Sequence, residues 1–432
     1  MTTARRIPWV VITAAGLLAI AAAPPPDGPT AWASGPLDVV VALPRPADAA
    51  AVAGLVGRTV PYYEQGAKGP AEPLGSLKIA GAVADDGGRT LRLAVDPQPR
   101  PARYVLDLGP IAPAGPIAYG LGGVEAVRIE GDVATADPAW TAWLPTPDLA
   151  GFRALAAASA EHARRLPDLA RPGLLRLDSQ VDLPPGEVVA TVESTAEIVE
   201  CLLGDGEPEG GVAKSADGRW VAKFALDGAP RPAFFSLTIR TGPDDPTPAV
   251  KLTASEAGSP AREVGASSFL LPWVSAALAA ARPAAMEIPD LAGGDPKRGE
   301  EAFFSKEALC SQCHVVKGRG DRVGPDLTTI GRKGAEHLYR SIAAPSESIT
   351  PDFVTYTVSL KDGRVAAGVV RAEGPGAIRV IDAEAKSVTL PRAEIDELRP
   401  AATSIMPVGL VPALGEARIR DIVAYLGAVA NE

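Results

Sequence analysis

Cys310-Ser311-Gln312-Cys313-His314 places two thiols three residues apart, with a histidine directly after the second. This spacing is the attachment pattern of c-type haem, in which the thiols add to the porphyrin vinyl groups and the adjacent histidine ligates the iron. A C-x-x-C pair can also be a redox-active disulfide or half of a zinc site. No βαβ pattern surrounds the pair, and Cys201 is the only other cysteine in the chain, so both alternatives are disfavoured.

Helical segments are predicted on both sides of this stretch. Asp295 to Ser305 has the pattern of a short helix before it, and Ala417 to Val429 has the pattern of an amphipathic helix near the C-terminus. The tetrapeptide Gly324-Pro325-Asp326-Leu327 follows the histidine. Together these segments resemble class I cytochrome c.

The resemblance implies two features of the haem site. The carbonyl of Pro325 accepts a hydrogen bond from Nδ1 of His314, which fixes the tautomer that leaves Nε2 for the iron. The C-terminal helix crosses the N-terminal helix near Gly299 and Phe303, where the missing side chain of the glycine permits close approach.

A sixth iron ligand is expected downstream. Met406, in Ser404-Ile405-Met406-Pro407, is the only methionine after residue 286, and its position fits the axial methionine of the family. His337, in a predicted helix at Ala335 to Ile342, is the alternative ligand. The expected iron ligands are therefore His314 and Met406, on one covalently attached haem c.

The segment between His337 and Met406 is not helical throughout. Short apolar runs separated by turn residues, among them Asp362-Gly363, predict a small β meander at about 352–398. With this insertion, residues 294–432 resemble the haem-binding c-type cytochrome domain of planctomycetes and related bacteria. This resemblance covers about a third of the chain.

The rest of the chain reads as β structure without a family resemblance. Short alternating apolar runs predict a β-sandwich-like domain at 34–145 and a second one at 171–258, joined by a helical connector at 146–170. A linker at 259–293 leads to the haem region. The expected fold class is therefore two all-β sandwich-like domains followed by an all-α cytochrome c domain with an inserted meander.

The N-terminus has the pattern of an export signal. Arg5 and Arg6 precede an apolar run from Ile7 to Ala23, and Ala31-Trp32-Ala33 has the pattern of a cleavage site, so residues 1–33 are expected to be a signal peptide. The protein is then periplasmic, with an uncleaved membrane anchor as the alternative. The formal net charge of −10 argues against nucleic-acid binding.

These observations favour an exported electron carrier or relay that exchanges electrons with a donor dehydrogenase and an acceptor protein, and that turns over no substrate itself. No catalytic residues are expected. Two alternatives remain: a haem enzyme or gas sensor with a labile sixth ligand, and an envelope-associated β-type binding protein with a redox appendage.

Overall fold

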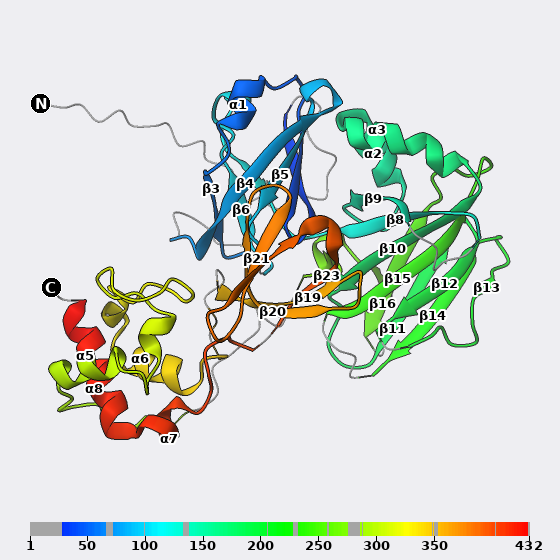
Figure 1. The fold of residues 1–432 in the computed structure, drawn as a ribbon. Helices are drawn as coiled ribbons and strands as arrows, with labels where there is room; N and C mark the ends of the chain where they lie inside the picture. The colour runs from blue at the N-terminus through cyan, green and yellow to red at the C-terminus, as the bar shows by residue number, and fades with distance from the viewer. Residues whose placement is uncertain are drawn as a thin grey trace, which may run out of the picture.

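Four antiparallel sheets and a cluster of short helices make up the computed structural model (Figure 1). Strands account for 38% of the residues and helices for 22%. The structure describes residues 28–65, 72–98, 100–132, 138–204, 206–227, 232–256, 259–274, 286, 288–347, 349, 353–401 and 403–430.

The first sheet has seven strands in the order β1-β2-β5-β4-β3-β6-β7. β1 contacts β7, which curls the sheet around its own core. The strands β2 and β5, second and third in this order, are almost wholly buried. The elements are β1 (Thr30–Gly35), β2 (Asp38–Ala42), α1 (Ala49–Ala53), β3 (Thr59–Tyr63), β4 (Gly75–Asp85), β5 (Thr90–Val95), β6 (Arg103–Leu106) and β7 (Ile117–Tyr119).

The second and third sheets form a sandwich. Their orders are β12-β15-β10-β8-β9, with β18 added to β10, and β13-β14-β11-β16-β17. Phe235 and Phe224, from opposite sheets, are both buried in the core between them. The strands are β8 (Val124–Glu130), β9 (Pro138–Leu144), β10 (Gly173–Val181), β11 (Val188–Ser194), β12 (Ile198–Leu203), β13 (Ala213–Lys214), β14 (Trp220–Leu226), β15 (Ala233–Thr241), β16 (Val250–Glu256), β17 (Arg262–Glu263) and β18 (Phe269–Leu270).

The prediction of two separate sandwiches is wrong. β8 and β9 fall within the predicted first domain, yet β8 pairs with β10 of the second, with Ala126 opposite Leu177. One hydrophobic core consequently runs through both regions, from Trp32 to Val274. The predicted connector is two helices, α2 (Ala150–Ala158) and α3 (Ala160–Arg165), because Ser159 is extended between them.

The prediction of an all-α cytochrome domain is also wrong. The fourth sheet, in the order β22-β21-β20-β19-β23, occupies much of this region and buries its apolar face around Leu37, in the turn between β1 and β2. The meander therefore packs on the N-terminal β structure instead of decorating a helical domain. Its strands are β19 (Thr355–Leu360), β20 (Val365–Ala372), β21 (Ala377–Ile381), β22 (Ser387–Pro391) and β23 (Ile395–Pro400).

Polar contacts reinforce this docking of the fourth sheet on the first. Arg392 donates hydrogen bonds to the carbonyl of Leu37 at 3.3 Å and to a carboxylate oxygen of Asp38 at 2.9 Å. The backbone N–H of Ala372 donates to Asp96 at 3.1 Å. The fourth sheet is thus joined to the first by both apolar and polar contacts.

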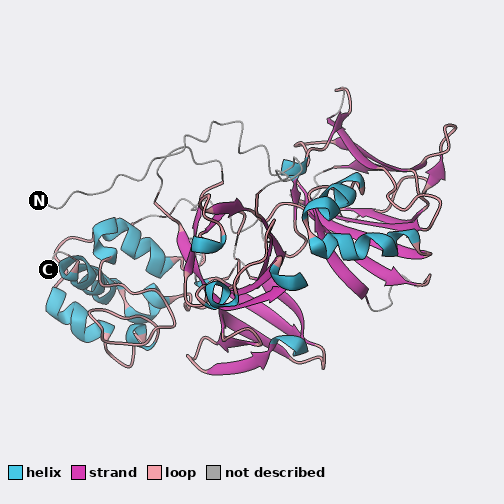
Figure 2. Ribbon diagram, turned by 90° about the horizontal axis from the view of Figure 1, so that it is seen from above, coloured by secondary structure: helices cyan, strands magenta, loops and turns pink. Residues whose placement is uncertain are grey.

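Four helices form a separate cluster with its own core. They are α5 (Pro296–Phe303), α6 (Ala335–Ala343), α7 (Leu410–Leu414) and α8 (Glu416–Val429). This cluster lies at one end of the molecule and the sandwich at the other, with the first and fourth sheets between them (Figures 1 and 2). None of the helices in the described ranges is long and apolar enough to cross a bilayer.

The two chain segments that join the helical cluster to the fourth sheet run side by side. The N–H of Ala401 donates to the carbonyl of Thr355 at 2.8 Å, and the N–H of Ser404 donates to the hydroxyl of Ser346 at 3.0 Å. We call this pair of segments the neck, defined by the described residues 344–347, 349, 353–355, 400, 401, 403 and 404. It connects the cluster to the β structure at the end of β19 and β23.

The expected cleavage position after Ala33 falls within β1. Residues 1–27, which hold most of the predicted signal, lie outside the described residues. Ala31-Trp32-Ala33, however, belongs to β1, where Trp32 is only 2% exposed. Its ring stacks on Trp143 at 5.9 Å and meets His162 edge-on at 5.3 Å. Cleavage there would remove a core tryptophan.

We predict that a chain beginning at Ser34 is less stable than one beginning at Gly28, because it loses Trp32 from the core. The Trp32→Ala variant should lose about 3–5 kcal/mol of unfolding free energy. Trp220→Ala, at a half-buried position, is the matched control and should cost less. Urea denaturation followed by tryptophan fluorescence measures the difference, and equal midpoints for the two chain starts would contradict the assignment of β1.

Candidate functional site

The Cys310–His314 stretch forms a tight turn. Leu309 has a left-handed backbone, with φ of 59°, and a single 3₁₀ turn at Cys310–Gln312 follows it. The N–H of His314 donates to the carbonyl of Cys310 at 2.9 Å. Cys313 directly follows this turn, so both cysteines and His314 lie on one short segment.

His314 has a fixed ring orientation. Its Nδ1 lies 2.9 Å from the carbonyl oxygen of Pro325, and because a carbonyl only accepts, Nδ1 is the donor and Nε2 is unprotonated. Burial lowers the pKa of His314, despite this hydrogen bond, so the ring is neutral at pH 7. A Cβ at Gly324 would lie 2.6 Å from the ring, so only glycine leaves space for it. The hydrogen bond implied by the resemblance is therefore present.

Backbone hydrogen bonds hold the loop that follows the histidine. The N–H of Gly324 donates to the carbonyl of Cys313 at 2.6 Å, and the N–H of Leu327 donates to that of Val315 at 2.8 Å. Asp321 is tied in the same way to Ser311, at 2.9 Å. These contacts place the Pro325 carbonyl against the ring through the backbone alone.

The two thiols are free and are not activated. Neither Cys310 nor Cys313 is in a disulfide. Burial raises the pKa of Cys310 to about 11, and burial together with Asp321 raises the pKa of Cys313. Redox-active dithiols require a lowered thiol pKa, so this environment does not suit a disulfide oxidoreductase. In the described ranges, no three His, Cys, Asp or Glu side chains come together as a metal site.

The two terminal helices of the cluster cross at Gly299. A Cβ there would lie 1.9 Å from the carbonyl oxygen of Asp421, so α5 and α8 approach each other as closely as backbones can. Phe303 packs its ring 5.8 Å from that of Tyr425. The crossing expected near Gly299 and Phe303 is confirmed.

An ion pair fastens this crossing. Asp421 on α8 accepts hydrogen bonds from Nε of Arg298 at 2.8 Å and from the backbone N–H of Asp295 at 2.7 Å. The Arg298 contact is the main reason why the pKa of Asp421 is lowered. Asp421 is buried, whereas the Arg298 side chain is largely exposed. The start of α5 is thereby tied to the middle of α8.

The candidate sixth ligands occupy different places. Met406 is half-buried in the loop between β23 and α7, and its N–H donates to the Ser404 hydroxyl at 3.1 Å. His337 is half-buried on α6. Met286 packs against the core of the helical cluster, a neighbour that the sequence analysis missed because no helical or turn pattern marks its segment.

The other reactive side chains have structural roles. Cys201 is buried in β12, and burial raises its pKa to about 12. His162 is fully buried, with Nε2 2.8 Å from the carbonyl of Trp143 and Nδ1 3.0 Å from the Ser159 hydroxyl. Both ring nitrogens are thus engaged within the core.

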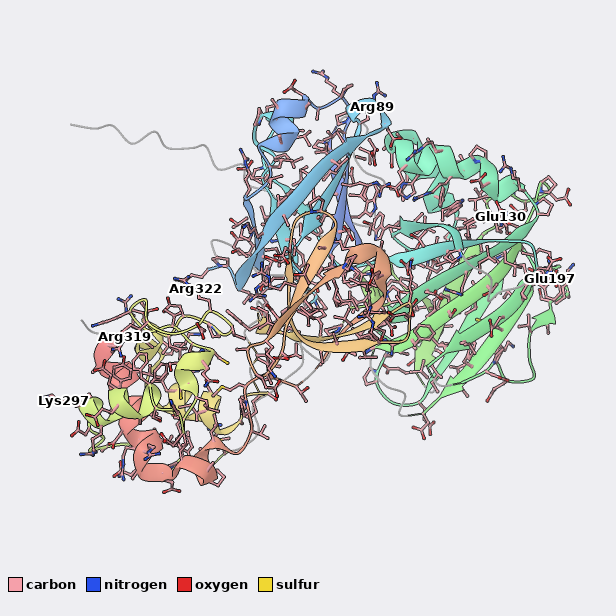
Figure 3. All side chains as sticks on the ribbon, viewed as in Figure 1. Arg89, Glu130, Glu197, Lys297, Arg319 and Arg322 are labelled. Atoms are coloured by element: carbon pink, nitrogen blue, oxygen red, sulfur yellow. The ribbon has the colours of Figure 1, made fainter. Side chains whose placement is uncertain are left out.

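Basic side chains lie on the outer side of the helical cluster. Figure 3 shows Lys297 and Arg319 there, away from the sheets. The Arg319 guanidinium pairs with Glu300 at 2.8 Å and lies 3.9 Å from the ring centroid of Phe304. This places a fixed positive group beside α5.

No protein-family model and no curated protein matches the chain. Among solved structures it is similar to an anti-sigma factor domain-containing protein from Clostridium clariflavum, at 10% identity and TM-score 0.22, over 40% of this chain and 51% of that one, about half its length. A PA14 sugar-binding domain from an RTX adhesin gives 12% identity and TM-score 0.23, over 35% and 99%. A second anti-sigma factor domain-containing protein gives 9% and 0.25, over 57% and 91%. Similarities this weak assign neither a fold family nor a function.

We predict that Asp421→Asn destabilises the helical cluster by about 1 kcal/mol at pH 7, a small value because Arg298 is exposed to solvent. Since the folded-state pKa of Asp421 is lowered, its charge stabilises the protein above the unfolded-state pKa and loses this effect as the pH falls through the folded-state pKa. The difference in stability between the variant and the wild type should therefore disappear in acid.

Hydrogen exchange of the α8 amides at pH 7 and at about pH 3 measures this difference in stability. Glu336→Gln, which breaks an exposed ion pair with Arg340 on α6, is the matched control and should have almost no effect. The role of the ion pair is contradicted if the difference in α8 protection is as large at about pH 3 as at pH 7. It is also contradicted if Asp421→Asn behaves like the control.

Proposed function

We propose that the protein is an exported electron-transfer protein that carries one haem c, attached through Cys310 and Cys313 and ligated by His314. The observation that supports this most strongly is the hydrogen bond from His314 Nδ1 to the Pro325 carbonyl, beside two free thiols on one turn. This arrangement presents a neutral imidazole with Nε2 available to a metal.

The residues present fit a covalent haem. The two cysteines lie on one short turn segment, and the histidine directly follows the second. When bound, the haem supplies a one-electron couple at its iron. Pro325 holds the tautomer and orientation of His314, and Gly324 leaves the space in which the ring lies.

Met406 is proposed as the sixth ligand. Its loop is held by Ser404, whose N–H is in turn bound by Ser346 across the neck, so the fourth sheet sets where this loop begins. A methionine in this position leaves no open site on the iron, which suits electron transfer and disfavours substrate turnover. A donor dehydrogenase and an acceptor protein are the expected partners.

Covalent attachment predicts that the exported protein keeps its haem through denaturing electrophoresis. A Cys310→Ala, Cys313→Ala double variant should lose haem staining, because both thioether links are then impossible. Cys201→Ala is the control and should stain like the wild type, since that thiol is buried in β12. Haem staining of the double variant would contradict attachment through Cys310 and Cys313.

The ligand assignment predicts that Met406→Ala abolishes the weak long-wavelength sulfur-to-iron band of the ferric protein. Met286→Leu and His337→Ala should keep that band, because these residues are proposed not to ligate the iron. Absorption spectra of the three purified variants decide between the candidates. Loss of the band in Met286→Leu alone would transfer the ligand role to Met286.

A further inference from the structure

A cleft in the β structure is lined by no residue of the helical cluster. It has a volume of about 850 Å³ and is bounded by β23 on one side and by the sandwich on the other. Its floor is the turn that carries Leu37 and Asp38. The proposed electron-transfer function does not use this cleft.

The edge of β23 faces this cleft. All six residues from Ile395 to Pro400 line it. Successive side chains of a strand point to opposite faces, so a cleft that met only one face of β23 would be lined by every second residue. β23 is the last strand of its sheet and pairs only with β19. Because the N–H of Ala401 binds the carbonyl of Thr355, the register directs the peptide N–H and C=O of Leu398 away from β19, while Asp396 is the extra residue of a β-bulge in this pair.

Carboxylates outnumber basic groups along the cleft. Arg392 is already paired with Asp38, and Arg399 with Glu397. The remaining acidic groups include Glu125, whose side-chain carboxylate accepts no hydrogen bond from a described residue. Five carboxylates and two guanidinium groups line the cleft: Asp38, Glu125, Asp178, Asp396, Glu397, Arg392 and Arg399.

Glu125 is poorly solvated, and the cation that acts on it, Arg176, is hydrogen-bonded to Asp178. It lies directly opposite Asp178 across the β8–β10 pair, and Asp178 is bound by Arg176 at 2.8 Å. Burial and the charge of Asp178 together raise the pKa of Glu125 to about 7. A positive group placed in the cleft would relieve this repulsion.

Two aromatic side chains give the cleft an apolar wall. Phe234 on β15 is 45% exposed, unusual for so large an apolar group. Trp273 is half-buried on a turn that Gln180 fixes through hydrogen bonds to the carbonyls of Pro272, at 2.8 Å, and Val274, at 2.5 Å. The cleft therefore offers a rigid apolar surface opposite an open strand edge.

We propose that this cleft binds an extended segment of a partner protein that carries basic and apolar residues and adds as a strand to the edge of β23. The backbone edge of β23 supplies affinity through main-chain hydrogen bonds. The acidic groups select positive side chains of the partner, and its apolar side chains pack against Phe234 and Trp273. This inference does not rest on the haem.

The probe is a fluorescein-labelled, capped nonapeptide of alternating Lys and Val, used with the full-length protein. Fluorescence anisotropy should show saturable binding. Methylation of alternate backbone nitrogens should abolish it, because the strand edge then has no donors to pair with. A peptide with Glu in place of Lys should not bind.

Variants test the walls of the cleft separately. Glu125→Gln and Phe234→Ala should each weaken binding of the peptide about tenfold. The first variant loses a charge-assisted contact, and the second loses an apolar contact. Glu130→Gln, at the exposed end of the same strand, is the matched control and should bind like the wild type (Figure 3).

Three results would overturn the proposal: no binding by the wild type, equal binding of the backbone-methylated peptide, or a Glu125→Gln variant indistinguishable from Glu130→Gln. Light scattering adds a fourth. A stable dimer that excludes the peptide would assign the cleft to a second copy of this chain and reject a separate partner.

Discussion

The burial of Leu37 inside the fourth sheet is the contact on which the arrangement of the molecule depends. It makes the five strands that interrupt the helical region part of the N-terminal β structure, and Arg392 completes the joint through Asp38. The helical cluster is then joined to a firm β support by the neck, where Ala401 pairs with Thr355. The proposed haem site is thus presented at one end of a long β scaffold.

Within the cluster, backbone contacts do most of the positioning. The crossing at Gly299 brings the first and last helices together, and the loop bonded to Cys313 places the Pro325 carbonyl against His314. Such contacts do not depend on long side chains, which lose rotamer entropy when ordered. The histidine is held in one orientation beside two free thiols.

Local features of the sequence were predictable, and long-range pairing was not. The helix predicted at Asp295 to Ser305 and the meander predicted at about 352–398 follow from short patterns, because each depends on one segment of the chain. The crossing at Gly299 was expected only from the family resemblance. The pairing of β8 with β10 joins segments on either side of a helical region, and alternation alone does not say which strand is the neighbour. The docking of Leu37 into the fourth sheet joins residues still further apart.

The central claim, covalent haem on Cys310 and Cys313, is tested most directly by the intact mass of the protein purified from the periplasm. We predict the mass of the chain after signal removal plus one haem, with no thiol left to alkylate except Cys201 in the denatured protein. A mass lower than that of the reduced chain by two hydrogens, with no added haem, would show a Cys310–Cys313 disulfide and contradict the account.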